Sequence, residues 1–370
     1  MVITGGAGFI GGTLVRWLLA TDPTIRVITY DALTYAGNLD SLATVFAAHG
    51  ATGDERHFFL KGDVCDGALL DALLEGMAQE TGSGRAIPRP DAIIHLAAET
   101  HVDRSILGPA AFITTNIVGT QVLLESARRT LERTPRPFRM LHVGTDEVYG
   151  DLEPDAPAWA EDTPLHPSSP YAASKAGADH LIGAWFRTFG TPVLLTRCGN
   201  NYGPFQFPEK LIPLMILNAL DEKPLPVYGD GLNVRDWLHV RDHCSALRAA
   251  LARGKPGETY NIGGRSERNN LQVVHGLIAA VDAQRPSAAG SRQRLIQFVK
   301  DRPGHDRRYA VDCSKAEREL GWQAQTRFEQ GLADTVAWYL SHQDWVSQVR
   351  SGEYRQWIEK HYQPAEKHRP

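Results

Sequence analysis

The segment Thr4-Gly5-Gly6-Ala7-Gly8-Phe9-Ile10-Gly11 follows a short apolar run and precedes a segment of helical length. It satisfies both the G-x-G-x-x-G spacing and the looser G-x-x-G-x-x-G spacing. Glycines at these positions allow a tight turn, bring backbone N–H groups close to a pyrophosphate, and let the next helix direct its positive end at it. The segment therefore predicts a dinucleotide-binding turn, with cofactor contacts from Gly5, Gly8, Phe9, Ile10 and Gly11.

Apolar, strand-like runs alternate with helix-length segments through the first half of the chain. The runs cover Val2 to Thr4, Arg26 to Asp31, Phe58 to Asp63, Ala92 to Ala97, Arg139 to Val143 and Val193 to Arg197. The candidate helices cover Gly11 to Ala20, Gly67 to Gln79, Ala111 to Arg133 and Tyr171 to Phe189. This alternation predicts an α/β fold with a Rossmann-type, doubly wound parallel sheet.

The pattern changes after about residue 197, where loops rich in proline begin and the order of elements becomes mixed. We expect an NAD-binding domain over 1–196, to which segments within about 232–262 return. Two strand-like runs, at Trp237 to Val240 and Thr259 to Ile262, are the expected additions to the main sheet. We expect a smaller C-terminal substrate-binding lobe over 197–231 and 263–362, and a flexible tail over 363–370.

An acidic residue ends each of the second and third predicted strands. Asp31 stands about 20 residues after the glycine-rich turn, where a carboxylate accepts hydrogen bonds from the adenosine ribose. An acid at that position favours NAD over NADP. Asp63 has two interpretations: it contacts the adenine, or it only caps a local turn.

Tyr171 and Lys175 are four residues apart at the start of a predicted helix, and so share one helix face. The pair follows the fifth predicted strand, where the nicotinamide end of the cofactor should lie. A nearby Lys175 and a cationic nicotinamide ring would lower the pKa of Tyr171 toward neutrality, so that it could deprotonate an alcohol. Thr145 would assist through its hydroxyl group.

Two adjacent carboxylates, Asp146 and Glu147, follow the apolar strand that ends near Val143. A water elimination next to a ketone needs one base and one acid, and close carboxylates help to keep one of them protonated. Consecutive strand residues face opposite ways, so both can face a substrate only if the strand has already turned, as Gly144 permits. Read alone, the segment is equally consistent with two exposed turn carboxylates.

Composition narrows the class of protein. Of 370 residues, 42% are hydrophobic and 22% are charged, with a net charge of -4 and no long block of one sign, so nucleic acid is not an expected partner. The four cysteines are scattered without a C-x-x-C pair, which predicts neither a metal site nor disulfides. No apolar run has membrane-spanning length, and no signal peptide is evident, so we expect a cytoplasmic protein without membrane contact.

Ordered motifs along almost the whole chain resemble the extended short-chain dehydrogenase/reductase superfamily, and specifically the dTDP-glucose 4,6-dehydratases. They are Asp31-Ala-Leu-Thr-Tyr-Ala-Gly-Asn38, Leu96-Ala-Ala-Glu-Thr-His-Val-Asp-Arg-Ser105, Thr145-Asp-Glu147, Tyr171-Ala-Ala-Ser-Lys175, Asn200-Asn-Tyr-Gly-Pro204, Phe207-Pro-Glu-Lys-Leu211, Asn233-Val-Arg-Asp-Trp237 and Asp301-Arg-Pro-Gly-His-Asp-Arg-Arg308. The chain departs from the usual pattern at Ala32, Thr100, Gly144 and Gly199, none of which is a reacting group.

The resemblance implies that Asp146 is the acid and Glu147 the base, and that Thr145, Tyr171 and Lys175 carry out oxidation and reduction with NAD. It implies a dTDP-hexose as substrate and a homodimer that pairs the helices at Ala111 to Arg133 and Tyr171 to Phe189. It also implies a substrate site formed by Thr100, Asn200, Glu209, Lys210, Leu211, Tyr228, Arg235, Asn270, Arg302 and His305.

The expected reaction oxidises C4 of the sugar, eliminates water across C5 and C6, and returns the hydride to C6, giving a precursor of deoxysugars such as rhamnose. One alternative is a UDP-sugar 4-epimerase or decarboxylase with the same Tyr/Lys pair, but such enzymes have no use for the two adjacent carboxylates. A dinucleotide sensor without enzymatic activity is a further alternative, against which the intact Tyr171 and Lys175 argue.

Overall fold

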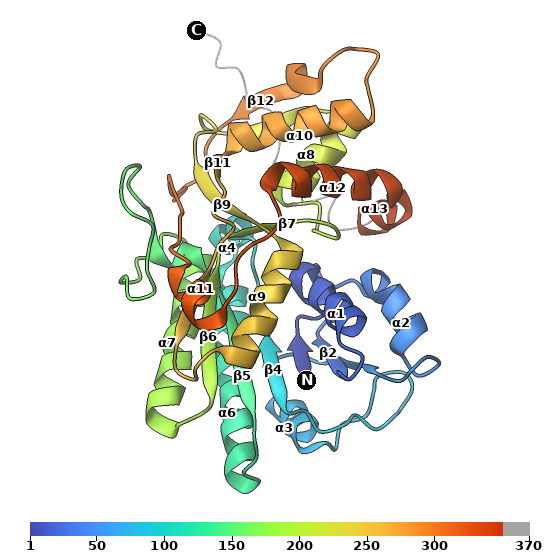
Figure 1. Cartoon of the computed structure of the whole chain (residues 1–370), viewed down its shortest axis with the longest axis vertical. Helices are drawn as coiled ribbons and strands as arrows, with labels where there is room; N and C mark the ends of the chain where they lie inside the picture. The colour runs from blue at the N-terminus through green and yellow to red at the C-terminus, as the bar shows by residue number, and fades with distance from the viewer. Residues whose placement is uncertain (351–370) are drawn as a thin grey trace.

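A computed structural model describes residues 1–350, which form a lower α/β domain and an upper, smaller lobe in the view of Figure 1. The expected flexible tail at 363–370 and the expected end of the lobe at 362 lie outside the described residues. Within residues 1–350, no helix is both long and apolar enough to cross a membrane.

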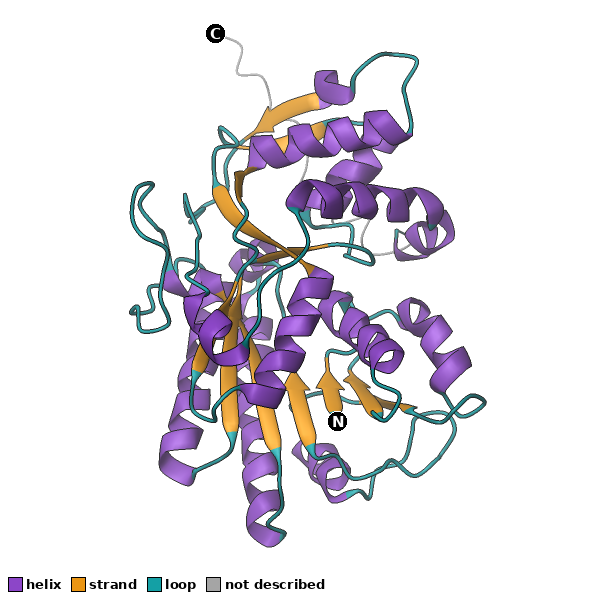
Figure 2. Ribbon diagram, viewed as in Figure 1, coloured by secondary structure: helices purple, strands orange, loops and turns teal. Residues whose placement is uncertain are grey.

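A parallel sheet of seven strands forms the centre of the lower domain (Figure 2). All neighbouring strands run in the same direction, which confirms the predicted doubly wound sheet. The order across the sheet is β10 (Thr259–Ile262), β6 (Val193–Cys198), β5 (Arg139–Thr145), β4 (Ala92–His95), β1 (Val2–Thr4), β2 (Val27–Asp31) and β3 (His57–Lys61).

Helices cover both faces of this sheet, and each face has its own apolar core. On one face lie α1 (Phe9–Thr21), α2 (Ala43–His49), α9 (Val240–Arg253) and α11 (Ser314–Leu320). On the other lie α3 (Gly67–Glu75), α6 (Gly119–Arg133) and α7 (Pro170–Phe189). The helix expected over Ala111 to Arg133 is built from α5 (Pro109–Phe112), the π-helical η2 (Ile113–Val118) and α6, preceded by α4 (Val102–Leu107).

The glycine-rich turn between β1 and α1 depends on glycine at two positions. Gly5 has a φ of 67°, in the left-handed region, and a Cβ there would lie 2.8 Å from the Ala97 nitrogen. A Cβ on Gly11 would lie 2.1 Å from the Gly5 carbonyl oxygen, so no side chain fits. Helix α1 then begins at Phe9, with Gly8 as an N-cap that has no side-chain hydrogen bond.

The upper lobe has a separate apolar core, made mainly by its helices. Its strands are β7 (Asn200–Tyr202), β9 (Val234–His239) and β11 (Glu267–Asn269) in one sheet, and β8 (Leu225–Tyr228) and β12 (Ile296–Val299) in another. Its helices are α8 (Leu211–Leu220), α10 (Asn270–Gln284), η4 (Arg292–Leu295), α12 (Phe328–Ser341) and α13 (Gln343–Val349).

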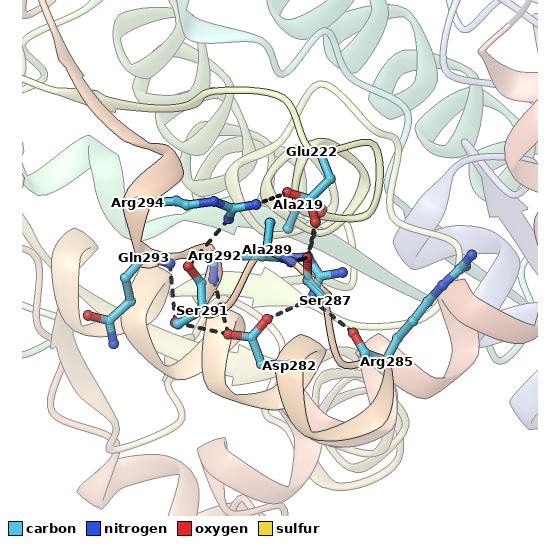
Figure 3. A network of polar contacts seen from close by, with 10 residues as sticks. All are labelled: Ala219, Glu222, Asp282, Arg285, Ser287, Ala289, Ser291, Arg292, Gln293 and Arg294. Atoms are coloured by element: carbon cyan, nitrogen blue, oxygen red, sulfur yellow. Dashed lines mark hydrogen bonds and ion pairs between the residues drawn. The ribbon is translucent and has the colours of Figure 1, made fainter.

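A buried arginine holds the far end of this lobe together (Figure 3). Arg292 donates to Asp282 Oδ1 at 2.6 Å and to the carbonyl oxygens of Ala219 and Arg285, at 2.7 and 2.9 Å. These bonds join η4 to α8 and α10, so removing Arg292 would leave buried acceptors unpaired.

One of the two strands expected to rejoin the main sheet does so. The run at Thr259–Ile262 is β10, which pairs with β6 at the edge of the main sheet. The expectation is wrong for the run at Trp237, which belongs to β9 and pairs with β7 and β11 in the lobe. The chain re-enters the lower domain only after His239, because the apolar face of α9 packs beside α1 on the sheet.

The turn that presents the two carboxylates also begins later than expected. Strand β5 continues through Gly144 to Thr145, and a 3-10 helix, η3 (Asp146–Tyr149), follows directly. Gly144 has a packing role instead, since a Cβ there would lie 3.0 Å from the Thr196 carbonyl oxygen. The change of direction thus falls between Thr145 and Asp146.

Candidate active site

A cavity of about 330 Å³ opens at the carboxyl ends of the main-sheet strands, between the lower domain and the lobe. Its walls include all of the predicted cofactor and catalytic residues, from five separate stretches of the chain. They are Gly5, Gly8, Phe9, Ile10, Gly11, Asp31, Asp63, Thr145, Asp146, Glu147, Tyr171 and Lys175. Ligands of open α/β sheets bind at this end of the strands.

The residues at one end of the cavity suit a dinucleotide. The first turn of α1 faces the cavity, and Gly8 leaves its backbone donors without a side-chain cap. Asp31 is held at the end of β2 by bonds from the Ala7 and Leu33 nitrogens, at 2.9 and 2.8 Å. This carboxylate keeps further lone pairs, so it can accept from a ribose while it remains fixed.

Asp63 retains both of its interpretations. Strand β3 ends two residues earlier, at Lys61, and Asp63 Oδ1 accepts a hydrogen bond from the Cys65 nitrogen at 2.8 Å. That contact forms a local turn, as the second interpretation expects. The residue also lines the cavity, where the first interpretation places it.

The predicted catalytic residues come together at the end of β5 and the start of α7. Thr145 is the N-cap of η3, its Oγ1 accepting from the Glu147 nitrogen at 3.3 Å and lying 3.4 Å from Asp146 Oδ1. Tyr171 and Lys175 occupy the buried face of α7. A hydroxyl group, a phenol and two carboxylates therefore line the same cavity.

Burial raises the pKa of both carboxyl groups, and their neighbouring charges distinguish them. Burial, and then the charge of Glu147, raise the pKa of Asp146 well above its ordinary value, and Asp146 Oδ2 has no hydrogen-bond partner among residues 1–350. Burial also raises the pKa of Glu147, but the positive charges of Arg302 and Arg235 oppose that rise. Asp146 is thus the better proton donor and Glu147 the better base.

The expectation for Tyr171 is not met by the residues of the chain alone. Burial, and then the charge of Glu147, raise the pKa of Tyr171 well above its ordinary value. Lys175 is not among the main charges acting on Tyr171, and its Nζ donates to the Val143 carbonyl oxygen at 2.8 Å. The hydrogen bond from Thr145 lowers the pKa of Tyr171, but burial and the neighbouring carboxylates have the larger effect.

The ten expected substrate residues fall into two groups. Thr100, Asn200, Glu209 and Lys210 line the cavity, and Lys210 Nζ donates to the Thr100 carbonyl oxygen at 3.1 Å. Six others stand outside its walls, and of these Leu211 packs against the lobe core at the start of α8. The remaining five are Tyr228, Arg235, Asn270, Arg302 and His305.

Two of those five act on Glu147 through their positive charge. Arg302, and then Arg235, are the positive charges that lower the pKa of Glu147 most. The rings of Tyr228 and His305 meet edge to face, with centroids 6.2 Å apart, and Arg302 Nη1 lies 3.7 Å from Asp103 Oδ1. Asn270 begins α10, and its backbone nitrogen donates to Asn233 at 3.1 Å.

Several cavity residues were not predicted from the sequence. Tyr35, Ser41, Phe205 and Trp345 line the walls. Tyr35 lies within a motif that carries the resemblance, which could have signalled it, whereas Trp345 is in a helix far along the chain and has no local signature. Among residues 1–350, no cluster of His, Cys, Asp or Glu side chains could hold a metal ion.

A Tyr/Lys pair on the helix after a central strand, facing a dinucleotide turn across one cavity, defines the extended short-chain dehydrogenase/reductase class. Within that class, the family model described as GDP-mannose 4,6 dehydratase matches residues 2–335. The dTDP-glucose 4,6-dehydratase of Xanthomonas campestris pv. campestris (strain B100) is 54% identical over 359 residues, covering 96% of this chain and 97% of the relative. That of Shigella flexneri is 50% identical over 375 residues, covering 98% and 99%.

Solved structures of two kinds of enzyme have a fold similar to that of this chain. DesIV, a dTDP-glucose 4,6-dehydratase from Streptomyces venezuelae crystallised with NAD, has a TM-score of 0.83 and 45% identity, covering 94% of this chain and 99% of that one. A UDP-glucose 4-epimerase from Thermotoga maritima has a TM-score of 0.78 but 25% identity, covering 92% and 98%. The chain belongs to the dTDP-glucose 4,6-dehydratase family and is an NAD-dependent enzyme.

Proposed function

We propose that this enzyme converts dTDP-glucose to dTDP-4-keto-6-deoxyglucose and water on bound NAD, with Asp146 and Glu147 as the eliminating pair. The observation that carries the proposal is the presence of both carboxyl groups in the same cavity as Tyr171, with pKa values that burial raises. A 4-epimerase would need no such pair, and the epimerase relative has the lower identity.

In the oxidation step, Tyr171 accepts the proton of the C4 hydroxyl group, assisted by Thr145. Bound NAD supplies the hydride acceptor and, through its ring, a positive charge. Gly5, Gly8, Phe9, Ile10, Gly11 and Asp31 would hold it, as the lining of the cavity suggests. Lys175, anchored at the end of β5, keeps a second positive charge near Tyr171. These positive charges favour the phenolate, whose formation burial and Glu147 disfavour.

In the elimination step, Glu147 removes the C5 proton, which the C4 ketone has made acidic. The C5–H electron pair forms the C5–C6 double bond, and the C6–O bond breaks. Asp146 donates a proton to the departing oxygen, so that water leaves. The raised pKa of Asp146 keeps it protonated for this role, and Arg302 and Arg235 help to keep Glu147 ionised. Glu147 would then return its proton to C5, and the reduced cofactor would supply the hydride at C6.

The substrate would lie between the two groups of binding residues. Arg235 and Arg302 would offer charge-assisted hydrogen bonds to a diphosphate, and Tyr228, Asn270 and His305 would add further contacts. Thr100, Asn200, Glu209 and Lys210 line the cavity where the sugar would enter. Leu211 would act indirectly, by packing the loop that carries Lys210.

The decisive experiment follows the fate of the C4 hydrogen. The purified enzyme would be incubated with dTDP-glucose deuterated at C4, and the label located by mass spectrometry and NMR. Deuterium at C6 of a 4-keto-6-deoxy sugar is the expected result. A product epimerised at C4 would support the epimerase alternative, and unchanged substrate with NAD bound would contradict the proposed substrate.

We also propose a homodimer that pairs η2, α6 and α7 with their copies. Ile113 and Val118 on η2 are 45% and 44% exposed, and Phe189 at the end of α7 is 49% exposed. Their burial against a second copy would remove this apolar area from water. Analytical ultracentrifugation should show a dimer that Val118→Glu dissociates. Phe298→Glu, at an apolar position on the lobe that is 55% exposed, should leave the dimer intact.

We also propose that the enzyme is located in the cytoplasm. Cys65, Cys198, Cys244 and Cys313 are free thiols in the structure, a state that a reducing compartment preserves. Cell fractionation should recover the enzyme with cytoplasmic markers, and recovery with a secreted fraction would contradict this location.

A further inference from the structure

Trp345 belongs to α13, near the end of the described chain, yet it lines the same cavity as the glycine-rich turn. Its indole Nε1–H donates to Ser41 Oγ at 2.9 Å, across 304 positions of sequence. Ser41 lies in η1 (Leu39–Leu42), just after β2, and also lines the cavity. Both side chains are buried, at 8% and 7% exposure, so solvent does not compete with this bond.

A second contact joins the same two parts of the chain. Phe205, from the loop after β7, lines the cavity and packs on Trp338 and Trp345, with centroids 4.4 and 5.6 Å away. The guanidinium of Arg16, on α1, lies 3.8 Å from the centre of the Phe205 ring, and Arg16 also donates to the Ser41 carbonyl oxygen. Cation–π, aromatic and hydrogen-bond contacts therefore connect Trp345, Phe205, Arg16 and Ser41 in a closed loop, which we call the circuit.

The backbone at Phe205 shows how firmly this circuit is held. Its φ is 67°, a left-handed conformation that an aromatic residue rarely adopts. Such a conformation persists where the surrounding packing determines it. Here the ring lies between Arg16 on the lower domain and Trp338 on the lobe.

The circuit stands at the cofactor end of the cavity. Ser41 follows Asn38, whose backbone nitrogen donates to the Ala7 carbonyl oxygen of the glycine-rich turn at 3.0 Å. Phe9 and Ile10, at the start of α1, line the same wall. By contrast, Asp146 and Glu147 belong to η3, which follows β5. In the sheet, β5 and β2 lie on opposite sides of β1.

We propose that Trp345, Ser41, Phe205 and Arg16 form an aromatic clasp that closes the cofactor end of the cavity and retains NAD through the catalytic cycle. The inference rests on the proposed function, in which the cofactor that is reduced at C4 must stay bound to deliver its hydride at C6. The clasp joins the lobe to the lower domain without using a catalytic residue. Cofactor release requires these contacts to open, so they slow dissociation.

The test measures cofactor exchange in the absence of sugar. The enzyme with bound NAD would be mixed with isotope-labelled NAD, and the label gained by the protein followed with time. Trp345→Phe keeps an aromatic ring but removes the indole donor, and Ser41→Ala removes the acceptor. We expect each change to accelerate exchange about five-fold, the effect of one net hydrogen bond, and the double variant to add little more.

The chain provides a matched control. Trp322 Nε1–H donates to Ser245 Oγ at 2.8 Å, and Trp322 is similarly buried but does not line the cavity. Trp322→Phe should exchange NAD at the wild-type rate. Wild-type exchange in Trp345→Phe and Ser41→Ala, or equal acceleration in Trp322→Phe, would overturn the clasp. Because no sugar is present, failure to turn over dTDP-glucose would contradict the proposed substrate and leave this result unaffected.

Discussion

Lys175 donates a hydrogen bond through Nζ to the carbonyl oxygen of Val143, at 2.8 Å, and the same nitrogen lies 3.4 Å from His142 Nε2. Burial, and then the charge of Lys175, lower the pKa of His142 well below its ordinary value, so the ring is neutral and can accept. Asp179 lies 3.8 Å from that ring. The ammonium group is thereby held at the end of β5, two residues before Thr145.

Replacing Lys175 by methionine should abolish this anchored charge while it keeps most of the side-chain volume. We expect the rate of C4 oxidation to fall by about 100-fold or more, because Tyr171 loses a cation that favours its phenolate. Rapid-mixing measurements of bound NADH in a single turnover report that step directly. Lys315→Met, which removes a lysine paired with Glu258 away from the cavity, should oxidise at the wild-type rate.

Variants of Asp146 and Glu147 should be blocked at a later step of the reaction than the Lys175 variant. Glu147→Gln and Asp146→Asn both keep the side-chain size but remove the base or the ionisable acid. We expect either variant to form bound NADH from dTDP-glucose and then stall, with product formation reduced by about 100-fold or more. The ratio of NADH formed to product released distinguishes these outcomes. Full product formation in Glu147→Gln would remove Glu147 from its proposed role.

The acid limb of the pH profile should depend on Arg302. Glu147 must be ionised to act as a base, so activity rises as the pH passes its pKa. Arg302 is the foremost charge lowering the pKa of Glu147, and its removal therefore raises that pKa. The acid limb of kcat in Arg302→Gln, measured at saturating substrate, should move to higher pH.

Another arginine serves as the comparison. Arg308 pairs with Glu267 at 2.7 Å and is not among the main charges that act on Glu147. Arg308→Gln should keep the wild-type acid limb. An unmoved limb in Arg302→Gln would show that Glu147 does not govern this part of the profile.

A buried histidine outside the cavity should make the fold sensitive to acid. Burial lowers the pKa of His243 to about 3, and its Nδ1 lies 2.9 Å from Asn201 Oδ1. In the unfolded chain the pKa of His243 has its ordinary value of about 6.5, so below that pH the unfolded state binds a proton that the folded state does not. The free energy of unfolding therefore falls as the pH drops below about 6.5. For this residue the loss between pH 7 and pH 5 is about 2 kcal/mol.

Urea denaturation at the two pH values measures this loss. His243→Gln keeps an amide that can bond Asn201 but does not titrate, so the pH-dependent loss should shrink by about 2 kcal/mol. His180→Gln, at an exposed position on α7, should retain the wild-type dependence. An unchanged loss in His243→Gln would mean that other groups account for the acid sensitivity.

Local pattern was sufficient for the sheet and for much of the site, because it depends on residues close in sequence. The glycine-rich turn, Asp31 at the end of β2, and the Tyr171/Lys175 pair are each set by a strand or helix and its immediate end. The spacing of Asp146 and Glu147 after β5 was likewise visible. Their shared wall of one cavity follows from parallel strands whose carboxyl ends meet at one edge.

Only the tertiary structure decided the parts that depend on distant chain segments. Three contacts could not be predicted from local sequence, because each joins residues that are far apart in the chain. They are the pairing of β9 with β7 in the lobe, the hydrogen bond from Lys175 to Val143, and the hydrogen bond from Trp345 to Ser41. The pKa of Tyr171 is of the same kind, since burial and Glu147 set its direction. The sequence by itself determined the class of fold and was sufficient to propose the reacting groups, because both follow from local backbone geometry and side-chain chemistry. Tertiary packing decided the pKa values of these groups and the contacts at the cofactor end of the cavity, because both depend on distances through space.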